Sequence, residues 1–199
     1  MLDRPLEHDY WDQNQSALGM DEAGRGPIAG PLMVAGVIFP KGYHNELIDD
    51  SKKLSEKKRE ALFDVIISSV RSYSIAYATV DEIENMNILN ATMLAMKRAV
   101  EGLNVKADYA MIDGNRLPNL DIDSEFIIKG DAKSMSIAAA SILAKVSRDR
   151  LLYEYAKEYP QYHFDKHKGY GTKAHVEALK KYGPCPYHRL SFLGKILDI

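Results

Sequence analysis

Five short apolar segments, each bounded by turn residues or charges, constrain the fold of this chain more than any other feature. Segments of this length and composition are typical of β-strands. Several of them carry apolar residues at consecutive positions, which predicts a sheet covered on both faces. The five segments are ALGMD (17–21), LMVAGVIF (32–39), SYSIAYATV (72–80), YAMID (109–113) and EFIIK (125–129).

Longer segments with helical spacing lie between and after these strands. Ser55, Asn87 and Thr172 precede three of them as candidate N-caps, and Gly183 follows the last as a stop signal. We expect an α/β fold with a central mixed β-sheet flanked by helices and with a helical C-terminal part, while strand order and pairing stay open. The expected helical segments are residues 56–70, 87–103, 134–160 and 172–183.

Length and composition exclude several classes of protein. The chain has 199 residues, of which 46% are hydrophobic and 27% charged, and we expect one globular domain over residues 1–199. No apolar run approaches the roughly 20 residues of a spanning helix, so no membrane association is expected. The polar start lacks the apolar core of a secretory signal, and we expect a cytoplasmic protein. Cys185 is the only cysteine, which excludes an intrachain disulfide and a cysteine zinc site.

The charge of the chain is unevenly distributed. The net charge is −2, but residues 161–189 carry six lysines and arginines against two acids and so sum to +4. Four of the six histidines lie in the same segment. A basic segment in an otherwise acidic chain suits the binding of a polyanion, although an ordinary solvated surface has the same composition.

The stretch GMDEAGRGPIAGP, residues 19–31, contains a G-x-G-x-x-A pattern from Gly24 to Ala29. A dinucleotide-binding loop of this pattern needs a helix that begins inside it. Here Gly30 and Pro31 interrupt the pattern and a strand follows, so this interpretation is rejected. A Walker loop is excluded as well, because no G-K-[ST] follows.

Four acidic residues follow three of the predicted strands. Asp21 and Glu22 end the first, Asp113 ends the fourth, and Asp131 follows the fifth and precedes the longest helix. Taken singly, they suit a charged strand end, an Asp-Gly turn and a helix N-cap. Successive strand residues point to opposite faces, so we expect the backbone to leave strand geometry at the Asp21–Glu22 pair if both serve one site. Together the acids predict a site at the edge of the sheet.

Clustered carboxylates repel one another and retain protons unless a cation compensates them. An all-oxygen ligand set without cysteine or histidine selects Mg²⁺ or Mn²⁺. Two such ions about 4 Å apart suit phosphodiester hydrolysis. The residues therefore point to a nuclease. A metal-dependent DNA nuclease or resolvase, and a non-catalytic nucleic-acid-binding module, remain as alternatives.

With these residues in place, the sequence resembles bacterial ribonuclease HII, the type 2 ribonuclease H family. The resemblance covers nearly the whole chain and is most specific in DEAGRGPIAGP and SIAAASILAKVSRDR, with IDGN, HKGYGTKAH and YGPCPYHRLSF in the family's order. It implies a ribonuclease H-like fold. It also implies endonucleolytic cleavage of RNA paired to DNA, including single ribonucleotides in duplex DNA, with roles in ribonucleotide excision repair and primer removal.

The resemblance also assigns residues. It implies that the four acids, Asp21, Glu22, Asp113 and Asp131, are catalytic and hold the metal ions. It implies further that Gly24, Arg25 and Gly26 sense the ribose and its junction to DNA, and that Tyr170 stacks on the following deoxyribose. For Tyr170, core packing is the alternative, and its flanking glycines favour an exposed loop.

Further positions of the matched motifs have a less defined role. Lys52 and Lys53 are candidate phosphate contacts, and a solvated charge run is the alternative. His188 and Arg189 match the family's tail motif without an assigned physical role. For the run of serine and alanine at residues 136–141 we expect close packing of a helix on the sheet. We expect RNA/DNA hybrid and ribonucleotide-containing DNA as partners, and a monomer.

Overall fold

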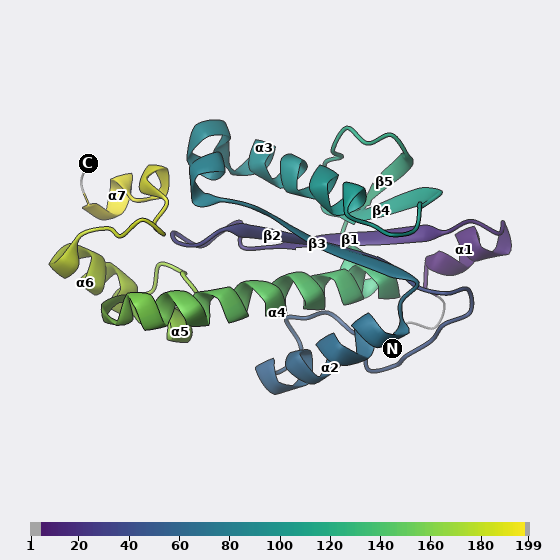
Figure 1. Ribbon diagram of the computed structural model, residues 1–199, viewed down its shortest axis with the longest axis horizontal. Helices are drawn as coiled ribbons and strands as arrows, with labels where there is room; N and C mark the ends of the chain where they lie inside the picture. Colours follow the sequence, from purple (N-terminus) through teal and green to yellow (C-terminus); the bar gives the residue numbers. More distant parts are fainter. Residues whose placement is uncertain (1–4, 198–199) are drawn as a thin grey trace.

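The computed structural model describes residues 5–197, and within them it contains one five-stranded mixed sheet (Figure 1). The strands are β1 (Ala17–Ala23), β2 (Leu32–Ile38), β3 (Ser72–Ala78), β4 (Tyr109–Asp113) and β5 (Asp123–Ile127). They lie in the order β3-β2-β1-β4-β5. The pairs β1–β2 and β2–β3 are antiparallel, whereas β1–β4 and β4–β5 are parallel. The predicted strands are therefore confirmed, and their order and pairing are now defined.

Helices cover both faces of this sheet (Figure 1). α3 lies on one face, and α4 with α2 lies on the other. The α-helices are α1 (Glu7–Asp12), α2 (Glu56–Ser69), α3 (Val80–Glu101), α4 (Met135–Glu158), α5 (Phe164–His167), α6 (Lys173–Tyr182) and α7 (Gly194–Leu197). Three short 3₁₀ turns are η1 (Gly130–Ala132), η2 (Pro160–Tyr162) and η3 (Leu190–Phe192).

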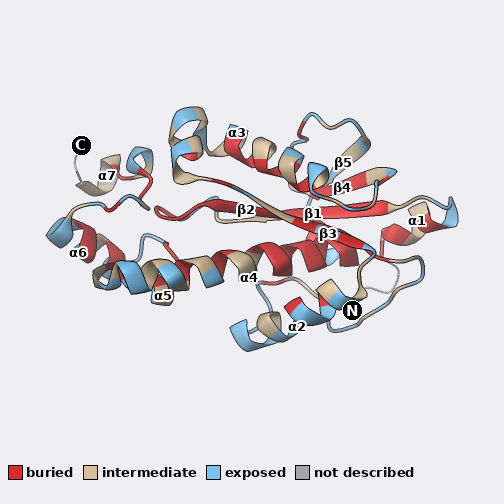
Figure 2. Ribbon diagram, viewed as in Figure 1, coloured by how far each residue is buried: buried red, intermediate tan, exposed pale blue. Residues whose placement is uncertain are grey.

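The strand β2 shows why the sheet is covered on both sides. All its residues are buried (Figure 2). Met33, Ala35 and Val37 pack into the apolar cluster with α4 and α2. Leu32 and Val34, which alternate with them, pack into the cluster with α3. Because strand side chains alternate between faces, a continuous apolar run of this kind is stable only between two layers, as predicted.

The first half of α4 lies directly on β1, which confirms the expectation for the small side chains of residues 136–141. A Cβ atom added to Gly19 would lie 2.4 Å from both the main-chain nitrogen of Ile137 and the main-chain carbonyl carbon of Ser136. No side chain fits between the two elements at this point. The approach fixes α4 against β1 and so places the next turns of the helix beside the C-terminal end of that strand.

One helix boundary differs from the prediction. α3 begins after Thr79, which forms a reciprocal capping box with Glu82, and not at Asn87. At Asn87 the backbone has a φ of 68° and the helix is kinked. The Asn87 side chain still caps the second part of the helix, since its Oδ1 accepts a hydrogen bond from the amide of Leu89. The first part was missed because its N-cap lies inside the predicted strand.

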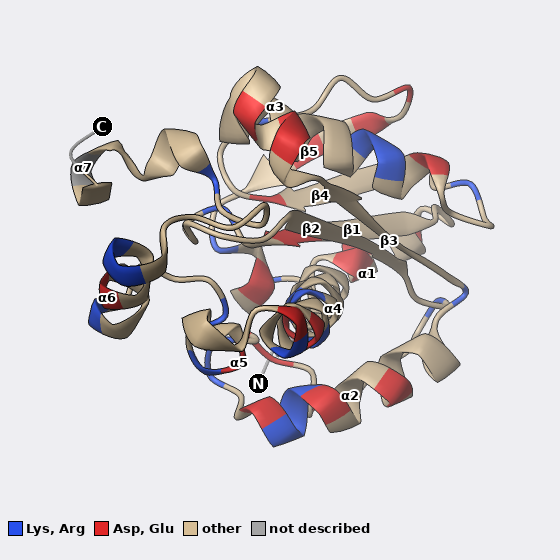
Figure 3. Ribbon diagram, turned by 60° about the vertical axis from the view of Figure 1, so that its left-hand side comes forward, with Lys and Arg blue, Asp and Glu red and all other residues tan. Residues whose placement is uncertain are grey.

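The C-terminal part is helical, as expected, and has its own apolar cluster. Leu152 of α4 packs there with Tyr162, Phe164 and Leu179. Figure 3 shows the lysines of α6 on the outside of this part of the molecule. Within residues 5–197, no helix is both long enough and apolar enough to cross a membrane.

Candidate active site

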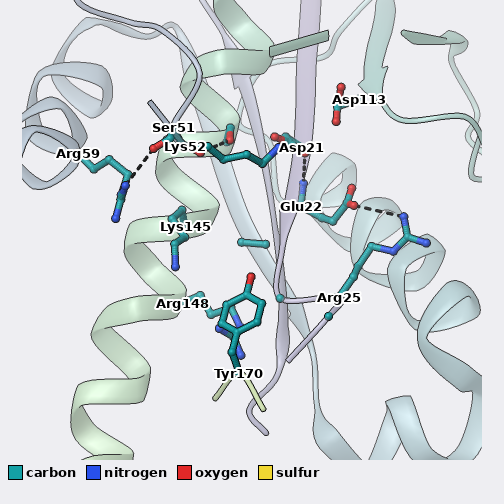
Figure 4. A pocket seen from close by; sticks show the side chains of 14 residues that line it. Asp21, Glu22, Arg25, Ser51, Lys52, Arg59, Asp113, Lys145, Arg148 and Tyr170 are labelled. Atoms are coloured by element: carbon teal, nitrogen blue, oxygen red, sulfur yellow. Dashed lines mark hydrogen bonds and ion pairs between the residues drawn. The ribbon is translucent and has the colours of Figure 1, made fainter. Parts of the chain in front are cut away.

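A cavity of about 270 Å³ opens beside the C-terminal end of β1 (Figure 4). The end of β1 and the glycine-rich loop after it form one part of its wall. The end of β4, residues 51–52, one face of α4 and the ring of Tyr170 complete the wall. Three of the four predicted acids line this cavity, namely Asp21, Glu22 and Asp113.

Parallel pairing brings Asp21 and Asp113 together. In the register between β1 and β4, Met20 lies beside Ile112, so that the next residue of each strand is one of the two aspartates. Partners in a parallel register point to the same face of the sheet. The topology therefore brings the two carboxylates together, because β1 and β4 lie side by side and an acid follows the last paired residue of each strand.

Glu22 reaches the same cavity although β1 keeps its strand geometry through Ala23. The expected departure of the backbone at this pair is therefore wrong. β1 is not paired with β4 beyond Met20, and both Asp21 and Glu22 line the cavity beside this unpaired stretch. The amide of Glu22 donates a hydrogen bond to Oδ1 of Asp21 over 2.7 Å, which fixes the buried Asp21 carboxylate at the strand end.

Asp131 is linked to the same place through β4. Oδ1 of Asp113 accepts a hydrogen bond from the amide of Gly130 over 2.7 Å, and Asp131 follows in η1. The Asp131 side chain is buried, and its Oδ2 lies 3.7 Å from Nζ of Lys52. The alternative of a helix N-cap for Asp131 is wrong, because Ser134 caps α4. The alternative of a hairpin turn at Asp113 is also wrong, because β4 pairs parallel with β5.

Burial, and after it the charge of neighbouring acids, raises the pKa values of three of the acids. Burial, followed by the charges of Glu22 and Asp113, raises the pKa of Asp21 well above its usual range. Burial and Asp113 also raise the pKa of Glu22, although Arg25 opposes the shift. For Asp131, burial comes first and the charges of Asp50 and Asp113 follow, so that its pKa is raised as well. Such shifts mean that the folded protein disfavours the ionised forms unless a cation joins them.

Several cations surround the acids without neutralising them. Nη1 of Arg25 lies 3.5 Å from Glu22, with its side chain 48% exposed. The pKa of Lys52 is raised, since the attraction of Asp131 and Asp21 outweighs the opposing effect of burial. Because the side chains of both cations are exposed, 48% for Arg25 and 79% for Lys52, they can exchange these partners for a bound polyanion.

The donor set fits divalent cations, since it offers carboxylate oxygens and an excess of negative charge. Among the described residues, however, no three acidic, histidine or cysteine side chains already stand together as a metal-binding group. In Figure 4 Asp113 lies apart from Asp21 and Glu22.

The predicted substrate-binding residues lie at the same cavity. Gly24, Arg25 and Gly26 line it together with Tyr170, whose ring is 46% exposed. Core packing is therefore wrong as the alternative for Tyr170. A Cβ atom on Gly26 would lie 3.7 Å from Cε1 of Tyr170, so the loop and the ring face each other closely. At Gly24 the backbone has a φ of 101°, a conformation that side chains rarely adopt.

The two candidate lysines differ in their position relative to the cavity. Lys52 lines the cavity. Lys53 does not belong to the lining; its Nζ lies 3.2 Å from Asp49, and its side chain is 59% exposed. Its role as a phosphate contact stays a prediction.

One face of α4 contributes residues that sequence reasoning missed. Ser141, Lys145 and Arg148 line the cavity at helical spacing. Oγ of Ser141 lies 2.7 Å from Oγ of Ser51, and its hydrogen bond to Asp21 lowers the pKa of that carboxyl against the larger opposing effects. Lys145 pairs with Asp149 over 2.7 Å. Their three- and four-residue spacing on a helix that follows an acidic strand end was the signal available in the sequence.

Acids at the ends of adjacent parallel strands, in a sheet of this order, define the class of ribonuclease H-like nucleases. Residues 18–195 match the family model described as Ribonuclease HII, and the chain belongs to that family. The family comprises metal-dependent endonucleases that act on the RNA of RNA/DNA hybrids. The expected fold class and the family resemblance are thus confirmed.

Individual relatives are similar to this chain over most of their length. Ribonuclease HII of Caldicellulosiruptor bescii is 54% identical over 181 residues, which cover 91% of this chain and 88% of that protein. Ribonuclease HII of Endomicrobium trichonymphae is 57% identical over 175 residues, or 87% and 83% of the two chains. The crystal structure of ribonuclease H2 from Pyrococcus horikoshii superimposes with a TM-score of 0.76 at 27% identity, covering 92% of this chain and 97% of that one.

Proposed function

We propose that this ribonuclease H cuts duplex DNA on the 5′ side of a single embedded ribonucleotide, in addition to the RNA strand of hybrids. The observation that carries the proposal is that one cavity is lined both by the acidic strand ends and by the loop of Gly24–Gly26 with Tyr170. A site of this shape brings a reader of the sugar next to the group that is cut.

The four acids, Asp21, Glu22, Asp113 and Asp131, would hold the divalent cations. The raised pKa values of Asp21, Glu22 and Asp131 support this role. So does the position of the acids, at the ends of β1 and β4 and in η1, whose Gly130 amide binds Asp113. Mg²⁺ or Mn²⁺, two per site, would supply activation of water and stabilisation of the leaving 3′ oxygen. The carboxylates would bring the negative charge that such ions require, and Lys52, whose Nζ lies 3.7 Å from Asp131, would give up this partner to them.

The glycine-rich loop and the tyrosine would select the sugar. A backbone without side chains at Gly24 and Gly26 lets a ribose approach the main chain, whose groups pair with a 2′-hydroxyl as donor and acceptor. The half-exposed guanidinium of Arg25 would bind a neighbouring phosphate. The exposed ring of Tyr170 would pack on the deoxyribose that follows. Lys53, further from the cavity, would contact phosphate along the strand.

The reaction is a hydrolysis that conserves the phosphate. The oxygen of water forms a bond to the phosphorus on the 5′ side of the ribonucleotide, and the bond to the preceding 3′ oxygen breaks. That oxygen takes up a proton and becomes a 3′-hydroxyl, while the ribonucleotide keeps a 5′-phosphate. Such ends suit ribonucleotide excision repair and primer removal, which we propose as the roles of the protein in the cytoplasm, acting as a monomer of one domain.

A cleavage assay tests this proposal. Duplexes that are identical except for one ribonucleotide are offered with Mg²⁺, with Mn²⁺ and with a chelator, and the ends of the products are mapped. We expect cleavage only of the ribonucleotide-containing duplex and only with metal. Asp113→Asn should abolish cleavage and leave binding largely intact, whereas Asp64→Asn, at an exposed position of α2, should leave activity unchanged.

Other outcomes would favour the rival functions. Equal cleavage of the all-DNA duplex would indicate a general DNA nuclease. Binding without metal-dependent cleavage would indicate a binding module. Full activity of Asp113→Asn would refute the assignment of the acids.

A further inference from the structure

Residues 185–189, which we call the tail segment, bind the glycine-rich loop of residues 24–30 along its length. The amide of Arg189 donates to the carbonyl of Ile28 over 2.9 Å, and the amide of Gly30 donates to the carbonyl of Tyr187 over 2.8 Å. Ala29 and His188 form the antiparallel bridge between them. The loop is therefore paired with the tail segment almost as a strand is paired in a sheet.

The side chain of Arg189 also binds the main chain of this loop. It is fully buried and donates five hydrogen bonds of 2.7–3.2 Å, all to main-chain carbonyls. The acceptors are Gly24, Arg25, Pro27 and Gly30, which span the loop from end to end. A guanidinium offers five donors in a fixed plane, and an ammonium group does not. One cation thus fixes the main chain of the loop proposed to read the ribose.

The tail segment also reaches the loop that carries Tyr170. Nδ1–H of His175 donates to the carbonyl of Tyr170 over 2.9 Å, which leaves its Nε2 as an acceptor. Nε2–H of His188 donates to this atom over 2.9 Å, and Nδ1 of His188 accepts the amide of Cys185. Each ring is neutral and each nitrogen has a partner, so the chain of hydrogen bonds fixes both tautomers. Both histidines are buried.

The two loops are joined directly as well. The amide of Ile28 donates to the carbonyl of Gly169 over 2.9 Å. The buried Arg148 donates to the carbonyls of Ala29 and Lys168 over 2.9 and 2.8 Å. The loop of residues 24–30 therefore lies between the tail segment and the Tyr170 loop, and every tie ends on main-chain atoms. This arrangement sets the separation of Gly26 and Tyr170.

We propose that the tail segment is a specificity-positioning element. Arg189 fixes the main chain of the 24–30 loop, and His188 fixes Tyr170 through His175, so that the space between Gly26 and Tyr170 accepts a ribose followed by a deoxyribose. The inference rests on the function proposed above, and it assigns these residues a role in selecting the junction. They touch no substrate.

A purely structural role predicts a different result. Loss of folded protein lowers the measured rate on every substrate by the same factor, so the ratio of kcat/KM between two substrates does not change. A uniform RNA/DNA hybrid contains no ribose-to-deoxyribose junction at the cut, whereas a single ribonucleotide in DNA does. The ratio of kcat/KM for the single-ribonucleotide duplex to that for the uniform hybrid therefore reports positioning alone.

Three variants test the element, with kcat and KM measured on both substrates. Arg189→Lys keeps the positive charge and loses the planar set of five donors. His188→Phe keeps an aromatic ring and loses the hydrogen bond to His175. Each should lower the ratio about tenfold, which corresponds to about 1.4 kcal/mol. His188→Gln, whose amide can donate to His175, should recover most of the ratio. Arg150→Lys, an exposed arginine paired with Glu60, is the matched control and should leave it unchanged.

A double-mutant cycle makes the test independent of any single variant. In a Tyr170→Ala background the effect of His188→Phe on the ratio should disappear, because the residue acts through Tyr170. If Arg189→Lys does not fold, the His188 variants decide alone. Ratios within about twofold of the unaltered protein, or effects that add in the cycle, would overturn the inference. Failure of the unaltered protein to cut the single-ribonucleotide duplex would instead refute the proposed function.

Discussion

Two buried histidines should lower the free energy of unfolding of the protein as the pH falls. Burial, reinforced by the nearby His167, lowers the pKa of His175 and of His188 from 6.5 to about 4. A histidine whose folded pKa is lowered contributes its full stability above the unfolded value of 6.5. The stability falls as the pH drops from there toward 4, because only the unfolded chain takes up the proton in this window.

The magnitude follows from the shift. At about pH 5 the unfolded chain is protonated at these positions and the folded protein is not, which costs about 2 kcal/mol for each histidine. The pair together should lower the free energy of unfolding by about 4 kcal/mol between about pH 7.5 and about pH 5. The raised pKa values of the cavity acids act in the opposite direction over part of this range. The total curve is therefore less informative than a difference between variants.

Urea unfolding of the unaltered protein and of His188→Gln at several pH values isolates the effect. The glutamine keeps a donor toward His175 and removes one titrating ring, so the stability difference between the two proteins should change by about 2 kcal/mol from about pH 7.5 to about pH 5. His44→Gln, at an exposed side chain near Glu46, should leave the pH dependence unchanged. A change below about 0.5 kcal/mol for His188→Gln would show that the pair is not buried in its neutral form.

Three further outcomes are expected. Asp21→Asn should abolish cleavage and preserve or increase the midpoint of urea unfolding, because it removes a buried charge repelled by its neighbours; a marked loss of stability would contradict the electrostatic account. Gly24→Ala should lower activity and destabilise the protein by at least about 1 kcal/mol, since its φ is 101° and its Cβ would lie 2.3 Å from Nε of Arg148. Removal of metal by a chelator should stop cleavage while circular dichroism stays unchanged, and added Mg²⁺ or Mn²⁺ should restore the rate.

The positions of the acids could be predicted because each follows a short apolar strand, and this pattern is visible in the sequence. That the acids lie close together was harder to predict, since it depends on the parallel pairing of β1 with β4. Strands that are separated in the sequence by β2, α2, β3 and α3 leave no local signal of their pairing. Asp21 and Asp113 lie at the same level of the sheet only because the register pairs Met20 with Ile112.

The residues of α4 at the cavity were missed for another reason. Ser141 was attributed to close packing on the sheet, and its neighbours in sequence do pack in this way. A small side chain serves both purposes, and composition does not separate them. Lys145 resembles any helical lysine until α4 is placed, and burial then lowers its pKa.

The buried arginines were beyond sequence reasoning because their partners are main-chain carbonyls, which every residue possesses. Arg148 and Arg189 form none of the ion pairs found among the described residues. Burial lowers their pKa values to about 10 and about 9, so both stay charged at neutral pH. Composition alone would place both at the surface.

This choice of partners has a consequence for the cavity that Arg148 shares with the acids. A guanidinium paired directly with Asp21 would neutralise it, lower its pKa and compete with any divalent cation for its oxygens. Nε, Nη1 and Nη2 of Arg148 instead donate to carbonyls of three different residues, which satisfies the cation without a carboxylate. The positive charge then holds the loops proposed to read the substrate, and it leaves the carboxylates free for the metal ions proposed to bind there. Separate partners for the two kinds of charge let one small cavity contain both.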